Sequence, residues 1–100
     1  MSSYRIVWED EAKAREIELF ADYAYEAGVV EVRSVYARRV TFYDPESRKP
    51  VRVVAVHTRS GSELLVRQYL AAREEAITIA EEIRSQLDQR DSDIAAQVAE

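Results

Sequence analysis

Residues 57–76, HTRSGSELLVRQYLAAREEA, decide the fold, because they fit two incompatible structures. Ser60 and Glu63 have the spacing of a capping box, in which a serine hydroxyl and a glutamate carboxylate bind free amide groups at the start of a helix. Ser60 and Gly61 also suit the tip of a β-hairpin, where glycine takes the left-handed conformation. One structure is a long helix, and the other is a turn, a strand and a shorter helix.

The long helix would run from Gly61 to Asp88. Its apolar residues would recur at spacings of three and four from Leu65 to Leu87, as on the buried face of an amphipathic helix. Its length would be roughly 42 Å, whereas a compact domain of this size has a diameter of about 34 Å. Four aliphatic residues would also lie off the apolar stripe: Leu64, Val66, Leu70 and Ile77.

The hairpin would close at residues 59–61 and lead into a helix over about residues 71–88. Its register segregates the side chains well, which is the property that fixes the register of a strand pair. We therefore expect the hairpin and a positive φ at Gly61, although the sequence leaves both structures open for residues 61–88. In the hairpin, aliphatic residues lie opposite one another on one buried face: Val56 with Leu64, and Val54 with Val66.

The N-terminal part of the chain predicts a strand and then a helix. Residues 4–8, YRIVW, alternate in the manner of a short strand. Residues 9–28 have acidic side chains in the first turn, where the helix dipole favours them, and Gly28 stands where a C-terminal cap belongs. An apolar stripe at spacings of three and four supports this helix, and it consists of Ile17, Phe20, Ala21 and Ala24.

The middle of the chain predicts strands. Residues 29–43, VVEVRSVYARRVTFY, are rich in β-branched and aromatic side chains. The even-numbered positions form the better core face, and Arg38 is the one residue that does not fit it. A bulge or bend near Arg38 and Arg39 would remove this conflict. The segment DPESRKP that follows predicts a loop opened by its Asp-Pro pair, and VRVVAVHT predicts another strand.

These elements predict an α+β fold in the order β-α-β-β-β-α. The last three strands would form an antiparallel meander, with the helices packed on one face of the sheet. The length of 100 residues and the presence of only two glycines and two prolines indicate one domain. We place this domain at residues 1–90 and expect residues 91–100 to form a C-terminal tail that is a frayed helix or disordered.

The composition excludes several kinds of chemistry. The chain has no cysteine and one histidine, so disulfides, thiolate chemistry and the usual zinc sites are excluded. His57 is expected to form a cross-strand ion pair with Glu63. No serine has the partners of a nucleophile, and no phosphate-binding glycine loop is present. We therefore expect no enzymatic activity, no metal site and no cofactor.

The N-terminal residues are charged and contain no long apolar run, and no segment approaches the length of a membrane span. We expect a cytoplasmic protein with no membrane partner. The net charge of −5 is unevenly distributed: residues 1–30 carry −4, residues 31–67 carry +4, and residues 68–100 carry −5. The basic middle third contains the predicted strands. The candidate binding residues on the outer face of their sheet are Arg33, Arg39, Tyr43, His57, Arg67 and Tyr69.

This outer face supports two functions. Arginine, tyrosine and aliphatic side chains together are typical of protein interfaces, and acidic helices beside a basic sheet favour association between copies. We therefore expect a small non-enzymatic protein-interaction domain that self-associates through its outer sheet face as a homodimer or another homo-oligomer; an unidentified protein partner also fits. The alternative is a domain that binds single-stranded nucleic acid, with tyrosines stacking on bases and arginines contacting phosphates. The negative net charge makes nucleic acid the less favoured partner.

Overall fold

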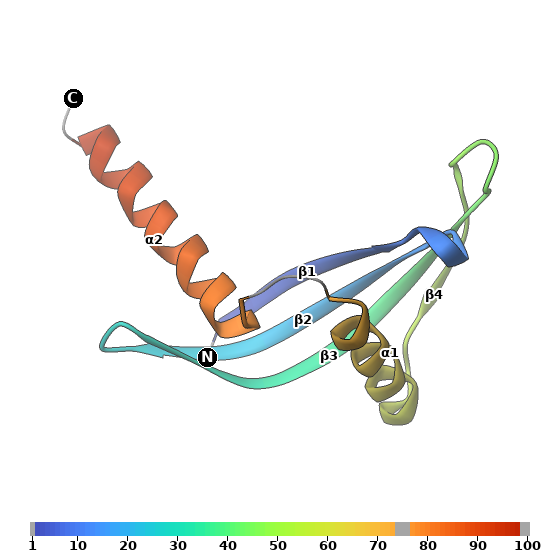
Figure 1. Ribbon diagram of the computed structural model, residues 1–100, viewed down its shortest axis with the longest axis horizontal. Coiled ribbons are helices and arrows are strands. Elements are labelled where there is room, and N and C mark those ends of the chain that lie inside the picture. Colours follow the sequence, from blue (N-terminus) through green and yellow to red (C-terminus); the bar gives the residue numbers. More distant parts are fainter. Residues whose placement is uncertain (1, 74–76, 99–100) are drawn as a thin grey trace.

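The computed structural model describes the backbone of residues 2–73 and 77–98 and the side chains as far as residue 88, and it has an α+β fold (Figure 1). Its sheet is a four-stranded antiparallel meander in the order β1-β2-β3-β4. The two helices follow the sheet, so the observed order is β-β-β-β-α-α and the predicted order is wrong. The elements are β1 (Ser2–Asp10), the 3-10 turn η1 (Glu11–Lys13), β2 (Arg15–Glu26), β3 (Val29–Tyr43), β4 (Pro50–Ala55), α1 (Arg59–Ala72) and α2 (Ile79–Val98).

The helix predicted over residues 9–28 is wrong, because most of this segment forms β2. Ile17, Leu19 and Ala21 are completely buried and alternate with polar residues such as Glu16 and Glu18. This period of two lies within the same residues that also show a helical stripe, and glutamate, alanine and leucine favour helices intrinsically. β2 pairs with β1 on one side and with β3 on the other, and these tertiary hydrogen bonds outweigh the local preference.

A two-residue turn joins β2 to β3. Glu26 pairs with Val29, and the residues between them have positive φ angles, 53° at Ala27 and 78° at Gly28. Two successive positive φ angles define the type I′ turn, whose twist matches that of the flanking strands. Gly28 therefore serves a hairpin and not the end of a helix. Its carbonyl oxygen accepts a hydrogen bond from the Arg84 side chain of α2.

β3 contains two bulges. Its register with β2 passes over Arg33 and again over Arg38, so the bulge predicted near Arg38 is confirmed. Each extra residue reverses which side chains face the core. The predicted even-numbered core face is therefore correct at the two ends of β3 and wrong between the bulges. The residues of β3 that pack on the core are Val30, Val32, Val35, Ala37, Val40 and Phe42.

Within residues 57–73, the described part of residues 57–76, the chain adopts neither of the two predicted structures. The amide of Gly61 donates to the Thr58 hydroxyl oxygen at 3.1 Å, so α1 begins directly after Thr58. Gly61 has no positive φ, and Leu64 is half exposed on the helix. α1 ends at Ala72, which rules out a single helix as far as residue 88. The hairpin fails because a threonine cap satisfies the first turn of a helix at this position.

A second threonine begins α2. The amide of Glu81 donates to the Thr78 hydroxyl oxygen at 3.1 Å, and the amide of Glu82 donates to the Thr78 carbonyl oxygen at 3.0 Å. α2 continues to Val98. The boundary predicted between a domain of residues 1–90 and a tail of residues 91–100 therefore falls within this helix.

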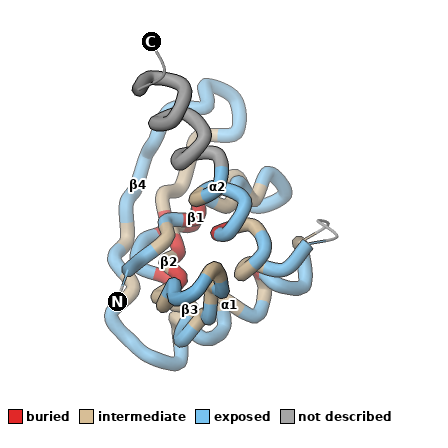
Figure 2. Tube along the Cα trace, turned by 90° about the vertical axis from the view of Figure 1, so that its left-hand side faces the viewer, coloured by how far each residue is buried: buried red, intermediate tan, exposed pale blue. Residues whose placement is uncertain are grey.

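The core lies between the sheet and the helices. We call the face of the sheet that carries Ile17 and Leu19 the inner face, and the opposite face the outer face. Tyr69 of α1 and Ile83 of α2 are buried against the inner face, and Figure 2 shows the buried segments gathered where the helices approach the strands. The amide of Ala37 donates to the Ser62 hydroxyl at 2.9 Å, which attaches α1 to β3 beside the second bulge.

Candidate functional site

The six predicted binding residues do not share one surface. Arg39 and Tyr43 lie on the outer face of β3 as predicted, where Arg39 contacts Glu18 at 3.1 Å and the Tyr43 hydroxyl donates to Glu16 at 3.2 Å. Arg33 occupies the first bulge, and its guanidinium lies 3.5 Å from the carboxylate of Glu31.

The other three predicted residues lie elsewhere, because a helix replaces the predicted hairpin. His57 is exposed in the connection between β4 and α1, and Arg67 is exposed on α1. Tyr69 is only 6% exposed. Its ring packs on the inner side of the sheet, with its centroid 5.9 Å from that of Trp8. The predicted basic surface with interleaved tyrosines is therefore absent from the described residues.

Two arginines flank one carboxylate on the outer face. Glu18 lies between Arg5, at 2.8 Å, and Arg39, at 3.1 Å. The hydrogen bond from Arg5, together with the positive charge of Arg39, holds the pKa of Glu18 below its usual value. Asp22 similarly accepts hydrogen bonds from the hydroxyls of Ser3 at 2.6 Å and Ser34 at 3.3 Å.

An aromatic pair interrupts this polar pattern. Phe20 and Tyr36 stack across β2 and β3 with ring centroids 5.9 Å apart. The guanidinium of Arg38, the residue at the second bulge, lies 5.5 Å from the centre of the Phe20 ring. The outer face thus presents one stacked aromatic pair beneath a cation, at the place where β3 bends.

The sheet has two free edges, β1 and β4, and they differ in regularity. β1 pairs with β2 over nine consecutive residues without a register shift. β4 is shorter, begins with Pro50 and has a shift in its pairing next to Tyr43. Proline and irregular pairing are common means of blocking an edge strand. β1 has neither, and it therefore offers the better template for another strand.

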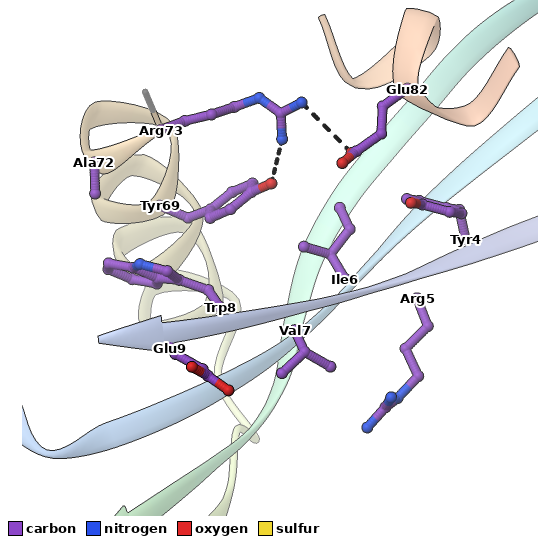
Figure 3. Close-up of a pocket in the computed structure, with 10 residues that line it drawn as sticks. All are labelled: Tyr4, Arg5, Ile6, Val7, Trp8, Glu9, Tyr69, Ala72, Arg73 and Glu82. Carbon is purple, nitrogen blue, oxygen red and sulfur yellow. Dashed lines mark hydrogen bonds and ion pairs between the residues drawn. The ribbon is translucent and has the colours of Figure 1, made fainter. Parts of the chain in front are cut away.

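A groove of about 500 Å³ follows the free edge of β1 (Figure 3). Six consecutive residues of β1, 4–9, line it. Within the described chain, no backbone hydrogen bond outside the sheet involves residues 2–10. The opposite wall comes from the end of α1 and the start of α2. The residues that line this wall are Tyr69, Ala72, Arg73 and Glu82.

Trp8 and Tyr69 form an aromatic part of the groove lining, and contacts within the chain fix its position. Figure 3 shows Trp8 next to Tyr69, whose hydroxyl accepts a hydrogen bond from Arg73. The Arg73 guanidinium also lies 3.4 Å from the Glu82 carboxylate, and its side chain is only 9% exposed. These contacts link β1 to the end of α1, and the end of α1 to the start of α2. Arg5, Val7 and Glu9 point to the opposite side of β1, so the two rows of side chains are chemically different.

A second pocket, of about 490 Å³, lies between η1 and the loop that joins β3 to β4. Acidic residues predominate in its lining, and Tyr43 is among them. Burial, and then the Glu16 carboxylate, raises the pKa of the Tyr43 hydroxyl. In the part of the chain that the structure describes, no group of carboxylates and histidine has the arrangement of a metal site.

Comparison of the chain with protein-family models, with curated proteins and with solved structures found no match. None of the described helices is long and apolar enough to span a membrane. The sequence indicated that residues 4–8 form a strand, but it did not indicate a groove, because the free edge and the helix wall both depend on the tertiary arrangement.

Proposed function

We propose that the chain is a non-enzymatic protein-interaction domain that binds an extended polypeptide segment at the free edge of β1. The observation that carries this proposal is the groove lined by six consecutive β1 residues. A groove along an edge strand suits recognition by strand addition, in which main-chain hydrogen bonds supply affinity and alternate side chains supply specificity. This site replaces the outer face expected from the sequence, where arginines and carboxylates are already paired with one another.

The two rows of β1 side chains would contact different side chains of the added segment. Side chains on its inner row would enter the groove and meet Trp8 and Tyr69, whose rings are already packed together. Side chains on its outer row would lie beside Arg5, Val7 and Glu9. Because the groove walls are held by existing contacts, little conformational ordering opposes binding, and the main entropic cost falls on the segment.

The test uses a synthetic nine-residue peptide of alternating valine and threonine, with an N-terminal lysine and a C-terminal glutamate. Titration into the isotopically labelled chain should shift backbone amide resonances of residues 4–9 and the Trp8 indole resonance. The same peptide with every backbone amide methylated is the matched control, because it lacks hydrogen-bond donors on both of its edges. No shift at millimolar peptide, shifts centred on β4, or equal binding of the methylated peptide would refute the proposal.

Binding of single-stranded nucleic acid is a second candidate function, and it rests on the outer-face pair Phe20 and Tyr36 beneath Arg38. Aromatic stacking next to a cation is a common means of holding unpaired bases. Fluorescence anisotropy of a labelled oligonucleotide should then show binding at low salt that weakens at high salt and is lost in Phe20→Ala. Absence of binding at low salt would eliminate this candidate.

A further inference from the structure

We infer that the segment bound at the edge of β1 is the β1 strand of a second copy of this chain. The inference rests on the proposed function, since it names the partner of the same groove. The two β1 strands would run antiparallel about a two-fold axis at Val7. A single sheet of eight strands would result, with the inner faces of both copies on the same side.

The residues of β1 are complementary to themselves in this arrangement. Residues 5–9 read RIVWE, a basic residue, three apolar residues and an acidic residue. Antiparallel pairing about Val7 places Arg5 opposite Glu9 of the second copy, and symmetry repeats this pair on the other side of the axis. Ile6 lies opposite Trp8 of the second copy, and the two Val7 residues meet. Opposite charges placed directly across two strands stabilise their pairing.

Other registers lose this complementarity. A two-fold axis at Arg5 would place the two Arg5 side chains directly opposite each other, and an axis at Glu9 would do the same to the two carboxylates. Like charges in that position destabilise a strand pair. An axis at Ile6 would leave both Arg5 and Glu9 without charged partners across the strands. An axis at Trp8 would place Glu9 opposite Val7, and Arg5 opposite Glu11, which lies beyond the end of β1. The charges therefore select the pairing about Val7.

Both charged groups are available for this contact. Arg5 bonds Glu18 through Nε, and its side chain is 54% exposed, so the terminal guanidinium nitrogens can reach a second carboxylate. Glu9 is exposed and makes no hydrogen bond or ion pair within the described residues. The free edge of β4 offers no equivalent, because Val51, Val53 and Ala55 carry no charge on its outer row. Charge complementarity therefore favours β1 as the edge that joins two copies.

Charge reversal tests this pairing. Arg5→Glu would place two carboxylates across each pair, and Glu9→Arg would place two guanidinium groups there, so each variant alone should be monomeric in sedimentation equilibrium. A mixture of the two variants restores both opposite-charge pairs in a mixed dimer, and its average mass should rise towards that of two chains. Recovery in the mixture cannot come from misfolding of either variant, which circular dichroism checks separately.

A second pair of variants compares the two edges. Val7→Lys places two ammonium groups at the proposed axis and should abolish association, whereas Val53→Lys on β4 should leave it unchanged. A wild-type chain that stays monomeric at every soluble concentration, or a charge-reversed mixture that does not associate, would overturn the inference. If the valine-threonine peptide still binds β1 in that case, the proposed function stands and only the partner is wrong; if the peptide also fails, both are wrong.

Discussion

Replacement of Ser62 by alanine tests how α1 is attached to the sheet. The Ser62 hydroxyl accepts a hydrogen bond from the Ala37 amide at 2.9 Å, and Ala37 is only 4% exposed. Ala37 precedes the bulged residue Arg38, whose carbonyl accepts a hydrogen bond from the Val56 amide at 2.9 Å. In Ser62→Ala the Ala37 amide keeps its buried position and loses its acceptor.

The expected cost follows from that buried amide. A buried donor left without a partner destabilises a protein by about 1–3 kcal/mol, while alanine regains a few tenths of a kcal/mol over serine as a helix former, roughly 0.3–0.5. The net loss of about 0.5–2.7 kcal/mol is a substantial part of the roughly 5–15 kcal/mol that holds a domain folded. For a domain of this length, each kcal/mol lowers the melting temperature by about 4–8 °C.

Ser60→Ala is the matched control, because Ser60 lies in the same first turn of α1 but is exposed, and its side chain makes no hydrogen bond to the residues that the structure describes. Urea denaturation followed by far-ultraviolet circular dichroism gives both free energies. Ser60→Ala should change the free energy of unfolding by less than about 0.5 kcal/mol. Equal effects of the two substitutions would refute the attachment of α1 through Ser62.

Three further changes test other parts of the structure. Ala27→Asn should raise the free energy of unfolding by about 0.5–1 kcal/mol, because asparagine tolerates the positive φ of a type I′ turn better than alanine does; a loss of stability on thermal denaturation would contradict that turn. Gly61→Ala should be close to neutral, since its Cβ would stand 2.8 Å from the Thr58 hydroxyl, and the damaged cap offsets the gain of about 1 kcal/mol in helix preference. Introduced into Thr58→Ala, which has no cap to damage, Gly61→Ala should stabilise the chain. Thermal denaturation of the wild type, the two single variants and the double variant measures this; if the two stability changes simply add, the contact is contradicted. Glu18→Gln should lower stability at neutral pH, and its difference from the wild type should close as the pH falls below 4.5 towards the lowered pKa of Glu18; a difference unaffected by acid would show that the lowered pKa does not contribute to stability.

The sequence predicted the fold class and the long central strand. β3 occupies residues 29–43, the range expected from its β-branched and aromatic side chains. The bulge at Arg38 was also predictable, because a single arginine on an apolar face requires either a change of register or a buried charge. The bulge at Arg33 was not predictable, because valines occupy positions on both sides of it and conceal the change of face.

β2 could not be identified from local pattern alone. Ile17 and Ala21 fit a helical stripe at spacings of three and four, and Ile17, Leu19 and Ala21 fit an alternating strand equally well. The decision comes from β1 and β3, which supply hydrogen bonds on both sides of β2. No property of residues 15–26 by themselves records the presence of these two neighbours.

Two threonines, Thr58 and Thr78, mark the helix boundaries in the sequence. Thr78 and Glu81 have the spacing of a capping box, and Thr78 does cap α2. That signal divides the supposed long helix in two and would have removed the objection to its length. Once α1 replaces the second strand of the hairpin, Tyr69 moves from the outer face into the core. The groove beside β1 then follows from the full arrangement, which explains why Tyr69 is the one predicted site residue that lines it.

The contact between Trp8 and Tyr69 also provides an intrinsic fluorescence probe of folding. Trp8 is the single tryptophan of the chain, so its emission reports the arrival of α1 on the sheet. Every strand pairs only with a neighbour in sequence, and pairings between sequence neighbours form quickly. The contact that changes the tryptophan emission joins β1 to α1, and the other three strands lie between these two elements in sequence. Stopped-flow fluorescence therefore times the docking of α1 on the sheet.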